Sequence, residues 1–267
     1  IQKEEDVSYL IYSKVPVVYD SVIPLNKEGF TNYVSQMYFG ESWLSTPNDP
    51  IAGARLKGDL CWGQSPVRVL LIEEDSLDIL NSLKEEIRSL YGIDKSSVHI
   101  NDMYEETLRL ARVVYNPNSV AFLNVGIPDL SHKLTAELEN YRKTIEGHRL
   151  NPDLFCVTGS AVMTMFGLRE CADLDYLHHD PNHVIQGSSY INSHEKELSK
   201  YPMNKDDILF NPYNHFYWNN VKFATLGVVK SLKAHRGEAF GLSNQTDLSR
   251  GEAKDLVDVK LMESVSG

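Results

Sequence analysis

Two short segments of this 267-residue sequence contain residue types that could bind a metal ion and phosphate together. Gly159-Ser160 is followed, after a spacer of twelve residues, by Asp173-Leu174-Asp175-Tyr176. Residues two apart on a strand face the same side, so Asp173 and Asp175 would present parallel carboxylates while their apolar neighbours pack in the core. Mg²⁺ takes oxygen ligands and is commonly shared between one or two carboxylates and substrate phosphates. We therefore expect Asp173 and Asp175 to hold Mg²⁺ or Mn²⁺.

The same region predicts contacts with the phosphates. A small Gly-Ser turn ahead of a helix supplies backbone N–H groups, so Gly159 and Ser160 would contact a donor's phosphates. Further along the chain, Lys230, Lys233 and Arg236 recur at spacings of three and would lie near one helical face. They could contact a diphosphate or triphosphate, or form an ordinary exposed basic helix.

Three histidines, His178, His179 and His183, follow the aspartate pair. Such a group could ligate a transition metal or donate a proton to a leaving phosphate. The alternative is a polar surface loop beside the site.

These segments resemble the motif of the nucleotidyltransferase-fold superfamily, which includes DNA polymerase beta, aminoglycoside nucleotidyltransferases and the LicD-type phosphocholine transferases. That motif is a hydrophobic residue, Gly-Gly or Gly-Ser, a spacer, and Asp-hydrophobic-Asp/Glu-hydrophobic. Thr158 departs from it, because it stands where the hydrophobic residue belongs. A strand at 221–226, a Lys-bearing helix and a helix with Lys254-Asp255-x-x-Asp258 are similar to the tail of many bacterial members. The resemblance covers roughly residues 151–263.

The resemblance implies a third carboxylate from a later strand. Asp207, in the segment 206–210, is the best candidate by its placement, and Asp206 is next. The alternative is that this segment is simply the solvated start of a strand.

The resemblance also implies a magnesium-dependent transferase that moves a phosphate-containing group from a nucleotide-activated donor to a small-molecule or glycan acceptor. Transfer of a phospho-alcohol or phospho-sugar, as in surface polysaccharide decoration, is slightly preferred over transfer of a nucleotide monophosphate. Two alternatives stay open: a non-catalytic module of the same fold that binds a nucleotide or a partner, and a glycosyltransferase that uses Asp-x-Asp to hold metal and diphosphate.

The elements that must position these residues indicate an α/β (α+β) protein with two lobes. We expect an N-terminal α/β lobe with parallel strands over residues 1–150, which could bind the acceptor or a partner, and a nucleotidyltransferase-like mixed-sheet lobe over 151–267. The turn Asn151-Pro152-Asp153 marks the boundary. Patterning predicts strands at 15–19, 67–72, 97–100 and 119–123, and helices at 30–43, 77–90, 103–115 and 131–147.

Composition excludes several classes of protein. The formal net charge of -11, from 26 basic and 37 acidic residues, disfavours broad binding to long nucleic acid. No apolar run is long enough to span a membrane, and the three cysteines form no zinc or disulfide pattern. P-loop, GxGxxG, GxSxG and HExxH motifs are absent from the sequence. We expect a cytoplasmic protein and, because the chain begins at Ile1, a piece of a longer polypeptide.

Overall fold

The computed structural model describes residues 2–46, 49–63, 66–125, 132–180, 185, 189–241 and 250–264. Within these ranges the chain is a mixed α/β protein with a two-stranded and a five-stranded sheet, which confirms the predicted class. It divides into unit 1 (Ile1–Tyr115) and unit 2 (Asn116–Gly267). The division therefore falls well before the predicted turn at Asn151, and the helices that precede this turn belong to unit 2.

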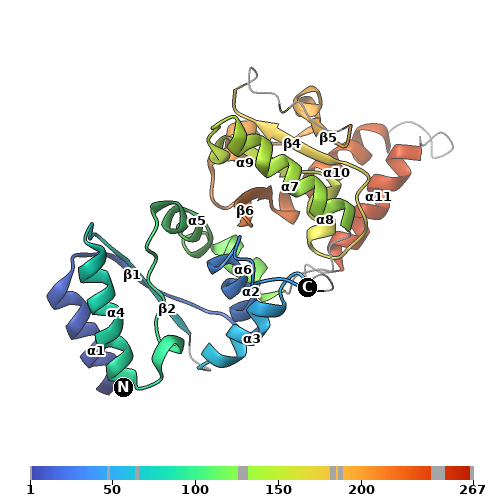
Figure 1. Cartoon of the computed structure of the whole chain (residues 1–267). Coiled ribbons are helices and arrows are strands. Elements are labelled where there is room, and N and C mark those ends of the chain that lie inside the picture. The colour runs from blue at the N-terminus through green and yellow to red at the C-terminus, as the bar shows by residue number, and fades with distance from the viewer. Residues whose placement is uncertain are drawn as a thin grey trace. The chain divides into compact units, whose positions relative to one another are not determined.

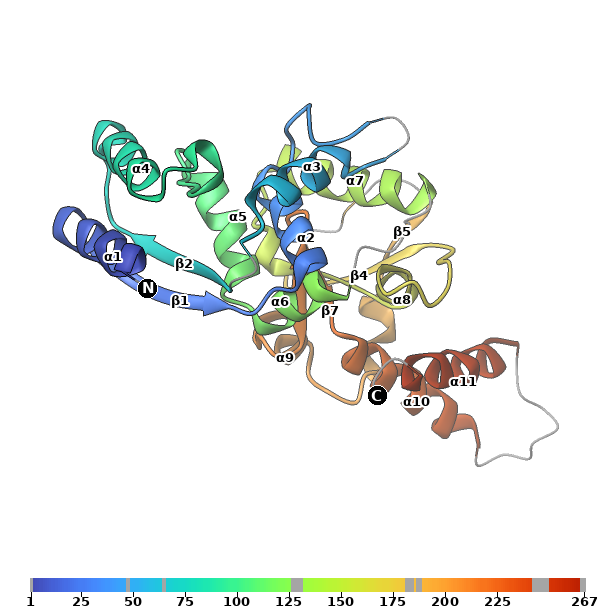
Figure 2. The same cartoon turned by 90° about the horizontal axis from the view of Figure 1, so that it is seen from below.

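Unit 1 is built from helices around a small sheet (Figure 1). Its elements are α1 (Gln2–Lys14), β1 (Val17–Ile23), α2 (Lys27–Met37), α3 (Ala52–Cys61), β2 (Val67–Ile72), α4 (Leu77–Tyr91), η1 (Asp94–Ser96) and α5 (Tyr104–Val114). The antiparallel strands β1 and β2 pack against α1 and α4, which lie side by side (Figures 1 and 2). Four of the predicted elements thus appear as β1, β2, α4 and α5, and the helix expected at 30–43 appears in part as α2.

The prediction of parallel strands in the first lobe is wrong, because β1 and β2 pair in antiparallel fashion. Residues 97–100 form no strand; instead Val98 and Ile100 are half-buried against the core of α1 and α4. Residues 119–123 lie in α6 (Pro117–Asn124), because Asn116 accepts a hydrogen bond from the Ser119 backbone and Pro117 takes the first helical turn. Asn116-Pro117, which directly follows the helix predicted at 103–115, therefore starts a second helix where a strand was expected.

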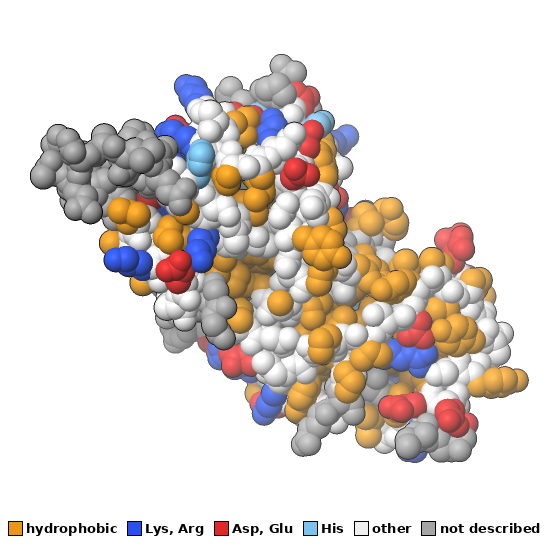
Figure 3. All heavy atoms as spheres, turned by 180° about the vertical axis from the view of Figure 1, so that it is seen from behind, with side chains coloured by type: hydrophobic (Ala, Val, Ile, Leu, Met, Phe, Trp, Pro, Cys, Tyr) orange, Lys and Arg blue, Asp and Glu red, His pale blue; other side chains and the backbone are white. Residues whose placement is uncertain are grey.

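Unit 1 also exposes most of the large hydrophobic side chains that reach the surface within the described ranges. On the face seen in Figure 3, apolar side chains are frequent over this unit. The most exposed of these side chains in unit 1 are Tyr9, Leu60, Tyr104 and Leu56.

Unit 2 contains the five-stranded sheet. Its elements after α6 are α7 (His132–Gly147), η2 (Pro152–Leu154), β3 (Phe155–Thr158), α8 (Ser160–Met165), β4 (Leu174–His178), β5 (Ile191–Ser193), η3 (Glu195–Lys200), α9 (Lys205–Phe210), β6 (His215–Trp218), β7 (Val221–Ala224), α10 (Leu226–Gly241) and α11 (Arg250–Glu263). The strand order is β5-β4-β3-β7-β6. The pairs β3/β7 and β4/β5 are parallel, whereas β3/β4 and β6/β7 are antiparallel, so the predicted mixed sheet is confirmed.

The two faces of β4 have different neighbours. Tyr176 is fully buried and its ring centroid lies 5.7 Å from that of Tyr141 on α7. Asp175 points to the opposite face, because neighbouring strand residues alternate. Helices α10 and α11 pack side by side (Figures 1 and 2). Residues of both helices line a cleft together with Asp175.

None of the helices in the described ranges combines the length and the apolar character needed to cross a membrane.

Candidate active site

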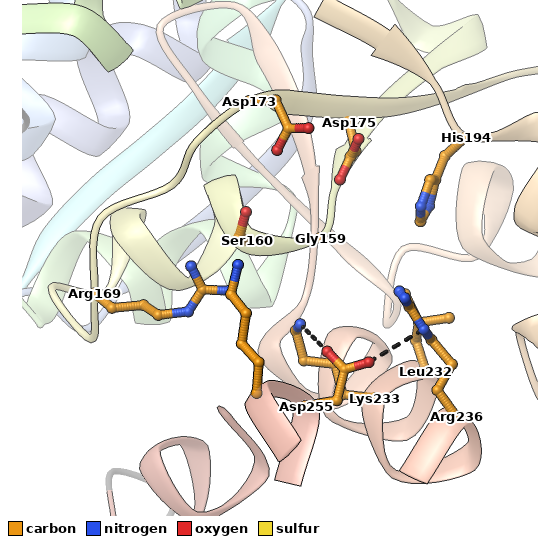
Figure 4. A pocket seen from close by; sticks show the side chains of 11 residues that line it. Gly159, Ser160, Arg169, Asp173, Asp175, His194, Leu232, Lys233, Arg236 and Asp255 are labelled. Carbon is orange, nitrogen blue, oxygen red and sulfur yellow. Dashed lines mark hydrogen bonds and ion pairs between the residues drawn. The ribbon is translucent and has the colours of Figure 1, made fainter. Parts of the chain in front are cut away.

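A cleft of about 200 Å³ lies in unit 2 between the start of β4, the turn after β3 and the helices α10 and α11 (Figure 4). Its lining residues are Gly159, Ser160, Arg169, Asp173, Asp175, His194, Leu232, Lys233, Arg236, Lys254 and Asp255. Six of the residues predicted from the sequence are therefore brought together: Gly159, Ser160, Asp173, Asp175, Lys233 and Arg236.

The β4 side of the cleft carries two carboxylates. Asp173 directly precedes β4 and Asp175 is its second residue, while Leu174 and Tyr176 are fully buried, as predicted. Burial, together with the negative charge of Asp173, raises the pKa of Asp175 to about 6, although Lys233 and Arg236 act in the opposite direction. The ionised form of Asp175 is thus disfavoured when no ligand is bound. A cation placed between the two carboxylates would stabilise the ionised form.

The turn after β3 is shaped by Gly159. Its backbone has φ 67 and ψ -144, a conformation that essentially only glycine adopts. A Cβ built there would lie 2.7 Å from Asp175 Oδ2, because Thr158 pairs with Asp175 across the sheet and brings the turn against the carboxylate. Ser160 follows as the first residue of α8, a helix of only six residues. The glycine therefore allows the chain to pass directly beneath the carboxylates (Figure 4).

A third side chain with oxygen and nitrogen atoms stands beside this pair. Asn192 on β5 is the register partner of Asp175, and its Nδ2 lies 3.4 Å from Asp173 Oδ2. In the parts of the chain that the structure describes, no group of three His, Cys, Asp or Glu side chains is placed to hold a metal ion. Two carboxylates nevertheless fit Mg²⁺ or Mn²⁺ when substrate phosphates and water complete the coordination. The donor set therefore suits a hard divalent ion that is shared with a ligand.

The opposite side of the cleft carries a chain of ion pairs. Lys233 Nζ on α10 lies 2.7 Å from Asp255 Oδ1 and 2.7 Å from Asp258 Oδ2, both on α11. Arg169 Nε donates to Asp258 Oδ1 at 2.6 Å, and Arg236 Nε lies 3.1 Å from Asp255 Oδ2. Burial acts to raise the pKa of Asp258, but hydrogen bonds from Arg169 and Lys233 lower it below its ordinary value.

This chain of ion pairs leaves positive charge in excess. Three cations, Arg169, Lys233 and Arg236, share two carboxylates, and Lys254 adds a cation that makes no ion pair with the described residues. Lys233 is buried between its two partners and acts as the structural centre of the group. Arg236 is half-buried, lines the cleft and contacts Asp255 through Nε at 3.1 Å. Its guanidinium has four further N–H groups that could donate to a ligand.

Several predicted residues lie elsewhere. Lys230 does not line the cleft but lies 3.3 Å from Glu263. Asp207 also does not line it: the segment that was expected to start a strand is the helix α9, capped by Asn204, and Asp207 is exposed in its first turn. Asn204 placed before two aspartates is a typical helix start, which explains the error.

His178 and His179 belong to no metal-binding group among the described residues. His178 is buried in β4, with Nδ1 2.7 Å from the Asp180 carbonyl oxygen and Nε2 3.1 Å from Ser193 Oγ. His179 is exposed and 3.5 Å from Asp206, and His183 lies outside the described residues.

Sequence reasoning missed three residues of the site, Arg169, Asn192 and His194. It named Lys254 only as part of the Lys-Asp-x-x-Asp helix and gave it no role in the site. Arg169 stands alone in its segment with no periodic pattern. Asn192 and His194 lie at the site because β5 pairs with β4, and this pairing cannot be predicted from a local sequence pattern.

Comparisons of this chain with models of protein families, with curated proteins and with solved structures found no match.

Proposed function

We propose that unit 2 is the catalytic part of a magnesium-dependent transferase. It would move a phosphate-containing group from a nucleotide-activated donor to a small-molecule or glycan acceptor. The observation that carries this proposal is the opposition of charge within one cleft: Asp173 and Asp175 on the β4 side, and excess cations on the α10 and α11 side. A metal–diphosphate complex would match both sides of this cleft, because its metal ion binds carboxylates and its phosphate oxygens accept hydrogen bonds from cationic side chains.

Each group has a separate role in this proposal. Asp173 and Asp175 would hold the divalent ion, which supplies charge neutralisation at the transferred phosphate. Arg236 and Lys254 would contact the phosphate on the leaving side, where negative charge increases during transfer. Gly159 would let the donor's phosphates approach the backbone beside the carboxylates. Positioning and electrostatics account for most of the rate in phosphoryl transfer, and these residues supply both.

Among donors we favour a nucleotide-linked phospho-alcohol or phospho-sugar, as used in surface polysaccharide decoration, over a nucleoside triphosphate. Unit 1 supports this preference because it offers an additional α/β unit with exposed apolar side chains that could bind an acceptor. A triphosphate donor would release pyrophosphate, whereas a nucleotide-linked donor would release a nucleotide monophosphate. The released product therefore separates the two chemistries.

A second candidate function is a non-catalytic module that binds a nucleotide. One observation favours it: Asn192, and not a third carboxylate, stands beside Asp173 and Asp175 within the described part of the chain. Such a module would bind a metal–nucleotide complex at the same cleft without releasing a product.

The test is to incubate the protein with Mg²⁺ and a panel of nucleoside triphosphates and CDP-linked donors, and to measure donor binding and product release separately. We expect Mg²⁺-dependent binding and release by the wild type, and a loss of at least about a hundredfold in turnover for Asp173→Asn. Asp207→Asn is the matched control, because it removes an exposed aspartate outside the cleft and should leave turnover unchanged.

The outcomes separate the candidate functions. Binding without release of any product would support the module and contradict the transferase. Absence of Mg²⁺-dependent binding across the panel, or full activity of Asp173→Asn, would contradict both.

A further inference from the structure

His194 lies at the same cleft and has no role in the function proposed above. It follows β5 and precedes η3, and its backbone N–H donates to the Tyr176 carbonyl oxygen at 2.8 Å. This hydrogen bond ties the residue to β4 directly after Asp175. In Figure 4 the His194 ring points into the cleft between Asp175 and Arg236.

One side of the imidazole is held by a chain of hydrogen bonds. His194 Nδ1 lies 2.6 Å from Tyr201 Oη, and Tyr201 Oη donates to Thr158 Oγ1 at 3.2 Å. Tyr201 and Thr158 are buried, and burial raises the pKa of Tyr201, so the phenol stays protonated. In the arrangement in which the hydroxyl hydrogen of Tyr201 is directed at Thr158 Oγ1, Nδ1 of His194 carries the hydrogen of its bond to Tyr201 Oη.

The other ring nitrogen is then an acceptor. Burial, with Arg236 and Lys200 acting in the same direction against Glu197 and Asp173, lowers the pKa of His194, so the ring is neutral at neutral pH. With hydrogen on Nδ1, the neutral ring has a lone pair on Nε2. Within the described ranges no side chain or backbone N–H donates to Nε2. A lone pair at the edge of a phosphate-binding cleft is what a general base requires.

We propose that His194 is the general base of the transfer reaction, an inference that rests on the proposed function. The acceptor hydroxyl oxygen forms a bond to the donor's phosphorus, and its proton passes to His194 Nε2. The bond between phosphorus and the leaving phosphate oxygen breaks, and its electron pair leaves with the nucleotide portion of the donor. Tyr201 is the positioning residue, since it fixes the tautomer and the direction of the ring.

This assignment accounts for the absence, among the described residues, of a third carboxylate grouped with Asp173 and Asp175. A carboxylate beside Asp173 and Asp175 would add a third negative charge next to a carboxyl group whose pKa is already raised. A neutral imidazole accepts a proton without that repulsion, because it becomes positive only as the reaction proceeds.

The test uses two variants and one control. His194→Asn keeps a side-chain N–H near the position of Nδ1 but has no lone pair at the position of Nε2, whereas Tyr201→Phe keeps the imidazole and removes its anchor. We expect His194→Asn to keep its affinity for the donor and for Mn²⁺, measured by calorimetry and electron paramagnetic resonance, and to lose roughly a hundredfold in kcat. Free imidazole should restore part of that loss, which it would not do for a purely structural defect. His179→Asn, which removes an exposed histidine outside the cleft, should behave as the wild type.

The tautomer is measured independently of turnover. The ¹⁵N chemical shifts of His194 in the wild type should show a protonated Nδ1 and an unprotonated Nε2 at neutral pH, and Tyr201→Phe should lose this preference. The opposite tautomer in the wild type, or an unchanged kcat in His194→Asn, would overturn the assignment while leaving the transferase intact. Failure of the wild type to bind any donor would instead contradict the proposed function, and binding without transfer would overturn both the transfer and the base.

Discussion

Gly159 and Asp175 are packed so closely that neither can change without affecting the other. A Cβ on Gly159 would lie 2.7 Å from Asp175 Oδ2 and 3.4 Å from its Cβ. The contact exists because β3 and β4 are antiparallel and Thr158 pairs with Asp175, so the residue after the strand lies over the carboxylate. The orientation of the Asp175 carboxylate is therefore set in part by the space that glycine leaves.

Gly159→Ala should impair the site more than the fold. We expect destabilisation of about 1–3 kcal/mol from the unfavourable backbone conformation, and a loss of Mg²⁺-dependent donor binding because Asp175 must move. Gly92→Ala is the matched control, since Gly92 also has positive φ, at the end of α4, but has nothing within 4 Å of the added Cβ. Chemical denaturation and calorimetric titration would measure both effects. Donor binding equal in the two variants would show that the contact with Asp175 is unimportant.

This relationship also shows what the sequence could predict. Gly159-Ser160 and the alternating Asp-Leu-Asp-Tyr segment are local patterns, and they led to the correct β4 geometry and to a shared cleft for Gly159 and Asp175. The close contact between them was not predictable, because it depends on the register of β3 against β4.

The roles of the cations depend even more on contacts between distant segments. Lys230, Lys233 and Arg236 are equivalent by spacing, but α11 supplies partners for each of them: Glu263 for Lys230, two buried aspartates for Lys233, and one of those aspartates for Arg236. Only the helix pairing shows that Lys233 is held between two buried aspartates, whereas Arg236 has one ion-pair partner on α11. The strand predicted at 119–123 failed for a different reason: Asn116-Pro117, directly before it, caps and starts α6.

Asp175→Asn should stabilise the metal-free protein at neutral pH. Because the pKa of Asp175 is raised from 3.8 in the unfolded reference to about 6, its contribution to stability is fully present below about pH 4 and is lost as pH rises through 6. A shift of about two pKa units corresponds to about 3 kcal/mol of unfolding free energy, which the wild type loses when Asp175 ionises. The variant does not lose it, because an amide stays neutral. The difference in unfolding free energy between variant and wild type, measured by urea denaturation without metal, should therefore grow between pH 4 and pH 7.

Mg²⁺ provides the internal check for this prediction. It should raise the melting temperature of the wild type and leave that of Asp175→Asn unchanged, because only the wild type has both carboxylates. A variant that is less stable than the wild type at pH 7 would show that Asp175 is charged at little cost.

Asp258→Asn should destabilise unit 2 strongly. Only 1% of the Asp258 side chain is exposed, and it accepts from both Arg169 and Lys233. Removing the charge leaves two buried or half-buried cations with too few partners, which costs about 3–5 kcal/mol in comparable buried groups. Glu263→Gln, which weakens the exposed ion pair with Lys230, should cost less than about 1 kcal/mol. Similar losses in thermal denaturation of both variants would contradict the structural role of the buried group.

Arg236→Ala should weaken donor binding while leaving the fold nearly intact. About 30% of the Arg236 side chain is exposed, and its partner Asp255 keeps Lys233, so the loss of one ion pair is small for stability. A charged hydrogen bond to phosphate contributes more, and its removal should raise the Kd for the donor by about tenfold or more. Lys230→Ala removes a cation from the same helix outside the cleft and should leave the Kd unchanged.

Arg236→Lys should recover only part of the affinity, because an ammonium group cannot pair with Asp255 and reach the phosphate with separate nitrogens. An equal effect of Arg236→Ala and Lys230→Ala would mean that the helix acts by general charge, and the assignment of Arg236 to the leaving phosphate would have to be abandoned.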